Sequence, residues 1–236
     1  MHPLDLQNSR LLGSQSFHFL ASPQTLKEQV LSLFSLRENR GFKSRPLIVW
    51  EPAPLDCKPE QFEQHVQACK IVDVFSPNHL ELTSLVQGND DDESLSFSHD
   101  AIERYATIFV ESGIGFQSKG LAAIRCGEHG CLILSQNQRA SWLPAFYDTQ
   151  SPRILDTTGA GNAFLGGFSV GLVKTKDSRE AAIMGSVAAS FAMEQAGLPV
   201  FSPATWILGE KWNNAAVAAR VKEFKKKLVE TRAVAL

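Results

Sequence analysis

Several features are absent from this sequence, and each absence excludes a class of protein. Its 236 residues include four cysteines, but none forms the Cys-x-x-Cys pair of a zinc or redox site. No run of about 18 apolar residues occurs, and the first ten residues lack the basic start and apolar run of a leader. The net charge is -2, which offers no basic surplus for nucleic-acid phosphates. We therefore predict a soluble, cytoplasmic protein with reduced thiols that binds neither nucleic acid nor membrane.

The composition of the chain is that of an ordinary globular protein. Hydrophobic residues make up 44% and charged residues 20%, so the sequence favours neither disorder nor a fibrous structure. A chain of this length can bury most of its apolar surface in one α/β domain. We accordingly predict one domain over residues 1–236.

Apolar spacing and turn residues predict alternating strands and helices in the first half of the chain. Ser22 and Pro23 mark one helix start, because serine caps helices and proline fits their first position. Strands joined by helical crossovers lie parallel, with helices packed on the faces of the sheet, which predicts a layered α/β fold. We expect strands at 16–20, 46–50 and 71–75, and helices at 22–40, 59–70, 78–86 and 99–113.

The second half of the chain is expected to add an antiparallel component and three helices. Strands at 121–126 and 131–135 flank the turn Gly127-Glu128-His129-Gly130, a hairpin-like connection. The polar stretch 87–93 has no apolar periodicity and lacks the spacing of a calcium-binding loop, so we expect a surface loop there. The three helices are predicted at 159–173, 178–195 and 213–231.

The segment 154–168 holds a glycine-rich turn followed by a helical pattern. Small residues at a helix start let an anion approach unpaired backbone N–H groups, where the helix dipole adds attraction. An ordinary tight turn with close helix packing would use the same residues. A dinucleotide fingerprint needs glycine or alanine where Phe164 stands, and no Gly-Lys-Ser/Thr of a Walker A loop occurs. Both common nucleotide-binding loops are therefore disfavoured.

Three segments, in order, resemble the motifs of the pfkB (ribokinase-like) carbohydrate kinases. Residues 156–164, Asp-Thr-Thr-Gly-Ala-Gly-Asn-Ala-Phe, are similar to that family's Asp-Thr-x-Gly-Ala-Gly-Asp-x-Phe signature. Residues 75–81 resemble its Asn-x-x-Glu motif, and residues 125–130 resemble its Gly-x-x-Gly phosphate loop. Segments 48–52 and 188–199 are similar to a fungal kinase-like branch of the family, the maintenance-of-killer group.

The resemblance implies a site for ATP and magnesium built from these motifs. Asn78 and Glu81 would lie near the ATP phosphates, with Glu81 acting indirectly on the magnesium ion. Alternatively, Asn78 caps its helix and Glu81 completes a capping box, and both interpretations can hold together. Gly127 and Gly130 would admit the nucleotide's phosphates, or they form a simple glycine turn.

The residues nearest the chemistry belong to the glycine-rich turn. By resemblance, Gly159, Ala160 and Gly161 form the anion hole and Asp156 braces the loop through backbone hydrogen bonds. Asn162 stands where these kinases place the aspartate that removes a proton from the sugar hydroxyl. A carboxamide cannot accept that proton at neutral pH. We therefore expect phosphotransfer, if present, to be inefficient.

The resemblance covers residues 16–203 and begins midway through the family's pattern. We expect the glycine-rich sugar-recognition segment and the lid strands to be missing, and both a natural short protein and an incomplete gene model fit this. One hypothesis is an ATP-dependent phosphotransferase acting on a sugar or nucleoside-like alcohol. Another is a non-catalytic pseudokinase that holds nucleotide as a regulatory module. A third is a structural fragment that binds nothing.

Overall fold

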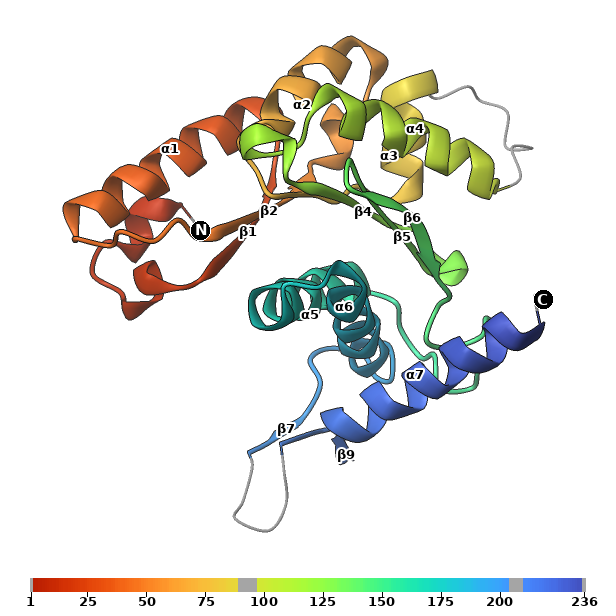
Figure 1. Ribbon diagram of the computed structural model, residues 1–236. Coiled ribbons are helices and arrows are strands. Elements are labelled where there is room, and N and C mark those ends of the chain that lie inside the picture. Colours follow the sequence, from red (N-terminus) through yellow and green to blue (C-terminus); the bar gives the residue numbers. More distant parts are fainter. Residues whose placement is uncertain (1, 89–96, 204–209, 235–236) are drawn as a thin grey trace. The chain divides into compact units, whose positions relative to one another are not determined.

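Strands and helices alternate along the first half of the chain, as the apolar spacing predicts (Figure 1). The computed structural model describes residues 2–88, 97–203 and 210–234. The strands are β1 (Ser16–Ala21), β2 (Leu47–Pro52), β3 (Val74–Phe75), β4 (Leu121–Arg125), β5 (Cys131–Ser135), β6 (Gln138–Leu143), β7 (Phe201–Ser202), β8 (Lys211–Trp212) and β9 (Ala215–Ala216). The α-helices are α1 (Pro23–Asn39), α2 (Phe62–Cys69), α3 (His79–Gln87), α4 (His99–Ser112), α5 (Ala160–Thr175), α6 (Ser178–Ala192) and α7 (Val217–Val234).

The chain divides into two compact units, each described here by itself. Unit 1 comprises Met1–Cys126 and Leu132–Ser141, and unit 2 comprises Gly127–Cys131 and Trp142–Leu236. The prediction of one domain over residues 1–236 stays a prediction.

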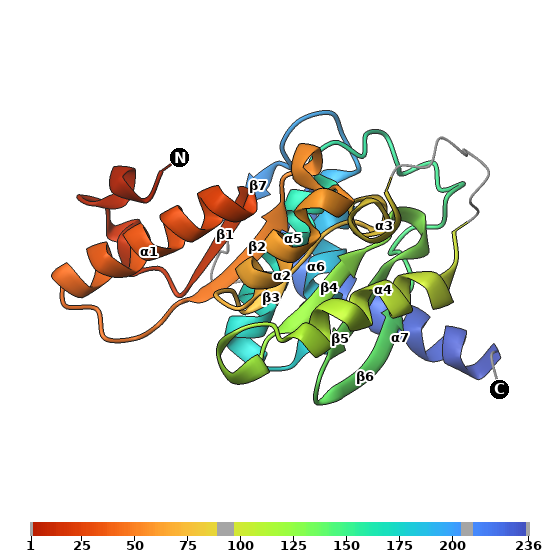
Figure 2. The ribbon, with the colours of Figure 1, turned by 90° about the horizontal axis from the view of Figure 1, so that it is seen from above.

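Unit 1 is built on a sheet whose strand order is β1-β2-β3-β4-β5-β6. The first four strands are parallel, with Ser16 opposite Leu47, Val49 opposite Val74, and Val74 opposite Leu121. The strand order advances in one direction, and crossovers of one hand then place every helix on the same face. Figure 2 shows α1, α2, α3 and α4 crossing that one face. Only five residues connect β4 to β5 and two connect β5 to β6, which is too short for a parallel crossover.

An aromatic cluster forms the core between the sheet and the helices of unit 1. Trp50 is fully buried, and its indole N–H donates to the carbonyl of Ala21 at 2.9 Å. Its ring centroid lies 5.1 Å from that of Phe75 and 5.4 Å from that of His65. Phe75 continues the cluster to Phe109 of α4 at 4.8 Å. The strands β2, β3, β4 and β5 are rich in apolar residues because most of their residues are buried.

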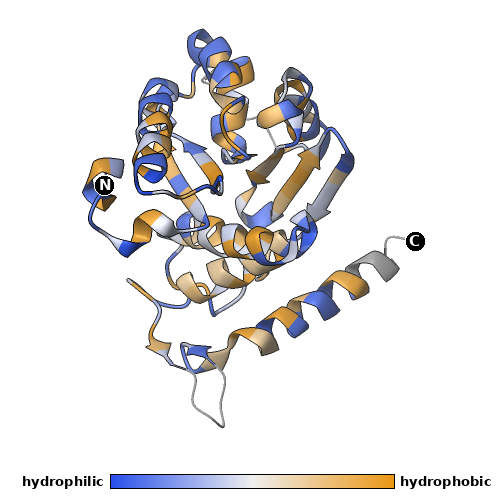
Figure 3. Ribbon diagram, turned by 60° about the vertical axis from the view of Figure 1, so that its left-hand side comes forward, coloured by the Kyte–Doolittle hydropathy of each residue, from blue (hydrophilic) through white to orange (hydrophobic). Residues whose placement is uncertain are grey.

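Unit 2 contains a closely packed helix pair, a small sheet and the helix α7. A Cβ atom added at Gly167 of α5 would meet the Met184 carbonyl at 2.6 Å, so glycine permits the close approach of α5 and α6. Strands β7, β8 and β9 form a three-stranded antiparallel sheet. Hydrophobic and hydrophilic positions alternate along α7 (Figure 3), and its Phe224 stacks on Phe146 with ring centroids 5.3 Å apart.

The structure confirms most of the predicted elements and corrects several. The strand expected at 71–75 is confined to Val74–Phe75, because the Ile71 and Val72 amides donate to the carbonyls of Ala68 and Cys69 and extend the turn after α2. Strand β6 was not predicted, since its residues are mostly half-exposed and carry no clear apolar alternation.

The C-terminal prediction also needs correction. The helix expected at 213–231 begins only at Val217, because Asn213 and Asn214 adopt positive φ angles of 49° and 63° and turn the chain. The two-residue strands of the small sheet were missed. In the predicted loop 87–93, Gln87 ends α3 and Gly88 follows it, while 89–93 lie outside the described residues.

All four cysteines are buried, and none of them is joined in a disulfide. Within the described ranges, no helix combines the length and apolar character that a bilayer crossing demands.

Candidate functional site

Asn78 and Glu81 lie together where β3 ends and α3 begins, in unit 1. The Asn78 side-chain oxygen accepts the Glu81 amide at 2.8 Å, and Glu81 Oε2 accepts the Asn78 amide at 2.7 Å. Glu81 Oε1 also accepts from Asn78 Nδ2 at 2.8 Å. The capping box weighed as an alternative is thus present in full. The i, i+3 spacing brings the two residues together as predicted.

Arg125, the last residue of β4, joins this capping box to an acid on β2. Its Nη1 lies 2.8 Å from Glu51 Oε1, and its Nη2 lies 3.5 Å from Glu81 Oε2. His18 of β1 places Nε2 3.0 Å from the other oxygen of Glu51. We call His18, Glu51, Asn78, Glu81 and Arg125 the Arg125 cluster. Except for His18, the third residue of β1, it lies at the carboxyl ends of parallel strands, the edge where α/β sheets bind ligands.

Burial and neighbouring charges shift the pKa values of the two acids of this cluster in opposite directions. Burial alone would raise the pKa of Glu51, but the hydrogen bond from His18 and the charge of Arg125 outweigh it and lower that pKa. Burial raises the pKa of Glu81, and the Glu51 charge adds to the rise, against the opposing effects of the Asn78 hydrogen bond and Arg125. The cluster therefore depends on Arg125 to keep two buried carboxylates together.

Sequence reasoning assigned no role to His18, Glu51 or Arg125. Glu51 and Arg125 stand within segments that carry the family resemblance, but they are separated by more than 70 positions in the chain. Only the order and register of β2, β3 and β4 bring them together. The sequence did contain a signal for this contact, because an acid and an arginine stand at the ends of predicted parallel strands.

Gly127 and Gly130 bound the short turn between β4 and β5, in unit 2. Gly127 has a φ of 55°, and a Cβ added there would meet nothing within 4 Å. Gly130 has a φ of 84°, and a Cβ there would lie 2.0 Å from the Leu143 carbonyl oxygen. Packing therefore explains Gly130, whereas the space beside Gly127 is open to a ligand.

The predicted anion hole forms the start of α5, also in unit 2. Asp156 Oδ1 accepts the Thr158 amide at 2.8 Å, so this carboxylate braces the turn. That hydrogen bond also lowers the pKa of Asp156. Gly159 precedes α5 with a φ of 81° and open space around its Cα, and Asn162 is exposed in the first turn. Ala160 and Gly161 lie between them, so these predicted residues are contiguous on one surface.

The first turn of α5 differs from those of five other helices. Each of α1, α2, α3, α4 and α6 has a capping side chain, an acidic residue in its first turn, or both. α5 has neither a capping side chain nor an acid there. The first N–H groups of a helix have no partner within the helix, and the positive end of its dipole favours an anion. The start of this 16-residue helix is thus suited to bind one.

A charged network follows α6 within unit 2. Both Glu194 oxygens accept from Arg220 at 2.8 Å, and Glu194 Oε1 accepts from the Tyr147 hydroxyl at 2.7 Å. Arg153 also donates to Glu194. Glu194 belongs to the segment that resembles the maintenance-of-killer group. Here the network ties that segment to α7 and to the strand-to-helix connection, which is a structural role.

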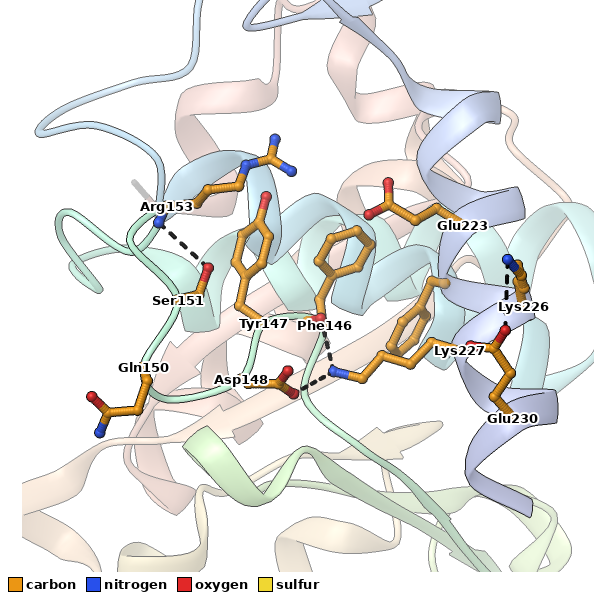
Figure 4. A pocket seen from close by; sticks show the side chains of 11 residues that line it. Phe146, Tyr147, Asp148, Gln150, Ser151, Arg153, Glu223, Lys226, Lys227 and Glu230 are labelled. Atoms are coloured by element: carbon orange, nitrogen blue, oxygen red, sulfur yellow. Dashed lines mark hydrogen bonds and ion pairs between the residues drawn. The ribbon is translucent and has the colours of Figure 1, made fainter. Parts of the chain in front are cut away.

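A pocket of about 730 Å³ lies beside this network, between residues 146–153 and α7 (Figure 4). Phe146 and Tyr147 line it together with charged side chains. Lys227 pairs with Asp148 at 2.7 Å, Lys226 with Glu230 at 3.6 Å, and Arg153 with Glu194. None of the predicted site residues lines this pocket. Its cations already have acidic partners.

The predicted residues thus fall into two sets. Asn78 and Glu81 belong to unit 1, and the others belong to unit 2. Among the described residues, no group of three or more histidine, cysteine, aspartate or glutamate side chains is placed to hold a metal ion.

Comparison of the sequence with protein families matches the profile of the pfkB family carbohydrate kinases to residues 4–205. The chain belongs to the pfkB carbohydrate kinase family. The match spans both units and includes all the motifs that carried the resemblance. The predicted family and the layered α/β fold are therefore confirmed.

Two curated relatives of this pfkB chain are fungal proteins. It is 33% identical to an uncharacterized protein of Schizosaccharomyces pombe over 98% of this chain and 65% of the relative. It is 28% identical to protein MAK32 of Saccharomyces cerevisiae over 88% of this chain and 56% of the relative. The chain thus spans between half and two thirds of the length of these relatives.

A solved pfkB-type structure supports the fold. The ribokinase of Arabidopsis thaliana, solved with ribose and ATP, superposes with a TM-score of 0.56 at 17% identity. The match covers 84% of this chain and 55% of the ribokinase. At that identity the likeness concerns the fold, a mostly parallel sheet flanked by helices.

Proposed function

We propose that this chain binds the phosphates of a nucleotide such as ATP at the first turn of α5. The observation that carries the proposal is the uncapped start of α5, where Gly159 has a positive φ and no acid lies in the first turn. Polyphosphate oxygens would accept hydrogen bonds from the Gly161 and Asn162 amides, which lie beyond the reach of intrahelical bonding. The ATP bound in the related ribokinase supports this choice of ligand.

The chemistry available at this turn favours binding over transfer. Backbone N–H groups would stabilise charge on a transferred phosphoryl group without a protein base. Asn162 is exposed in the first turn, where its amide cannot remove a proton from an alcohol. The loss of a general base costs on the order of 10²- to 10⁴-fold in rate. We infer a nucleotide-binding kinase-like protein with slow transfer to a sugar or nucleoside-like alcohol, or none.

A thermal-shift titration tests the proposal. Millimolar ATP or ADP should raise the melting temperature, because a ligand that binds only the folded state stabilises it by about 2.7 kcal/mol at a hundred times its Kd. Adenosine lacks the phosphates and should raise the melting temperature far less. If neither nucleotide shifts the transition, or adenosine does so equally, the α5 turn is not the phosphate site.

A further inference from the structure

The guanidinium of Arg125 lies between two buried carboxylates. The side chains of Arg125, Glu51 and Glu81 are 13%, 10% and 8% exposed, so water screens their charges weakly. Arg125 contacts Glu51 at 2.8 Å and Glu81 at 3.5 Å, and it also donates to the Ser76 carbonyl at 3.0 Å. Arginine remains protonated at any physiological pH. One fixed positive charge therefore serves both acids.

The surroundings of Glu81 are a poor fit for magnesium, on which the family resemblance implies that Glu81 acts indirectly. Magnesium demands near-ideal octahedral oxygen geometry. Oε1 already accepts from Asn78 Nδ2, and Oε2 accepts the Asn78 amide on the side that faces Arg125. A dication at Glu81 would have to share the oxygens with these hydrogen bonds and lie close to the fixed positive charge of Arg125.

Glu51 lies between Arg125 and His18. Arg125 Nη1 lies 2.8 Å from its Oε1, and His18 Nε2 lies 3.0 Å from its Oε2, a buried oxygen that has no partner in hydrogen-bonding geometry among the described residues. Two neighbouring carboxylates ordinarily attract a cation, because each raises the negative potential at the other. Here the chain itself supplies that cation at the carboxyl ends of the parallel strands.

We propose that Arg125 is a positioning residue that takes the place of a divalent cation beside the Asn78–Glu81 pair. The pair then recruits no magnesium, and Glu81 serves to fix Arg125 and the start of α3. One expectation rests on the proposed function: the chain should bind ATP equally well with and without magnesium. The other expectation, that the wild-type chain binds no divalent cation at this pair, can be tested without nucleotide.

Metal binding without nucleotide gives the first test, with free Mn²⁺ measured by electron paramagnetic resonance. The wild-type chain should bind no Mn²⁺ at micromolar concentration. Arg125→Ala should gain a Mn²⁺ site, and millimolar Mg²⁺ should raise its melting temperature, because two carboxylates then face the space left by the guanidinium. Arg125→Lys retains the charge and should gain neither.

Two results would overturn the proposal. The first is micromolar Mn²⁺ binding by the wild type that the substitution Glu81→Gln abolishes. The second is an Arg125→Ala protein that folds but gains no Mn²⁺ site. If Arg125→Ala does not fold, the wild-type titration and the nucleotide test below decide.

The nucleotide test compares the wild-type ATP affinity in magnesium and in EDTA by calorimetry. We expect the two Kd values to agree within about threefold. A tenfold difference in Kd would correspond to about 1.4 kcal/mol of binding free energy. A tenfold loss in EDTA would overturn the role of Arg125. Absence of binding in both buffers would instead contradict the proposed function, and the Mn²⁺ titration would still decide the role of Arg125.

Discussion

In unit 1 the Arg125 cluster joins side chains of opposite charge that pair with one another, whereas in unit 2 the first turn of α5 presents backbone N–H groups. The cluster holds Glu51, Glu81 and Arg125 within 3.5 Å of a partner. The α5 turn has no capping side chain and no acid. An anion gains hydrogen bonds at the turn without breaking any, whereas at the cluster the guanidinium of Arg125 already pairs with two carboxylates. Charged side chains therefore occur in the Arg125 cluster, where they pair with one another, and small neutral residues occur at the α5 turn, where backbone N–H groups are available to an anion.

The largest expected effect tests whether the cluster is braced by Arg125. Arg125→Ala leaves two buried carboxylates uncompensated and should lower the free energy of unfolding by about 3–5 kcal/mol, measured by urea denaturation. Arg45→Ala is a matched control, because Arg45 pairs with Asp73 in the same unit but is 40% exposed. An exposed pair contributes about 0–1 kcal/mol. Equal losses in the two variants would show that burial does not set the Arg125 cluster apart.

The next effect concerns the missing base at the α5 turn. Asn162→Asp should raise phosphotransfer by as much as ~10²-fold where an acceptor binds, because a carboxylate can accept the hydroxyl proton. ADP release above the ATPase background, over a panel of sugars and nucleosides, measures it. Asn137→Asp adds the same charge in the exposed β5–β6 turn and should change nothing. If the wild type already transfers efficiently and Asn162→Asp adds nothing, another residue is the base, and Asp156 is the first to test.

A smaller effect separates binding from stability at the same turn. Gly161→Asp should weaken ATP binding by roughly tenfold, since its carboxylate would compete with phosphate for the helix N–H groups. The introduced aspartate also stabilises the first turn of the helix, so the melting temperature without ligand should stay the same or rise. Gly161→Ala should affect affinity less. Calorimetry on the three proteins measures this, and equal affinities would make the turn purely structural.

The smallest effect is the pH dependence of the cluster. The pKa of Glu51 is lowered in the folded chain, so its contribution to stability is present above its ordinary value of 4.5 and is lost as the pH falls below it. The pKa of Glu81 is raised, so its contribution has the opposite sign and is lost as the pH rises. Glu51→Gln should therefore lose less stability than the wild type between pH 6 and pH 3.

Urea midpoints at constant ionic strength measure this difference. Glu60→Gln, which changes an exposed acid of unit 1, should follow the wild type. A wild-type profile indistinguishable from that of Glu51→Gln would contradict the shift assigned to Glu51.

Local signals predicted much of this fold. The Ser22–Pro23 helix start is confirmed by the bond from the Thr25 amide to Ser22 Oγ at 3.1 Å, and apolar runs located β2 and β4. Weakly patterned segments were missed, because β6 is largely half-exposed and the small sheet has strands of two residues. In such strands tertiary pairing outweighs local preference.

The residues of the candidate site likewise divide into those that local sequence signals predict and those that depend on long-range pairing. Asn78, Glu81 and the α5 turn follow from short-range spacing, which a sequence displays directly. The contact between Arg125 and Glu51 depends on two intervening strand pairings, and Gly130 is constrained by the distant backbone of Leu143. Such contacts are set by register, which apolar patterns specify only loosely where both faces of a strand are buried.

Two buried cysteines can serve as chemical probes of different parts of the chain. Burial raises the pKa of Cys57 in unit 1 to about 12, with help from the Glu81 charge, and burial raises the pKa of Cys131 in unit 2 to about 12. Because the thiolate is the reactive form, alkylating reagents should modify either thiol only while its surroundings are open. The labelling rate of each cysteine, followed by mass spectrometry, would therefore report separately the local opening after β2 and at the start of β5 within one intact chain.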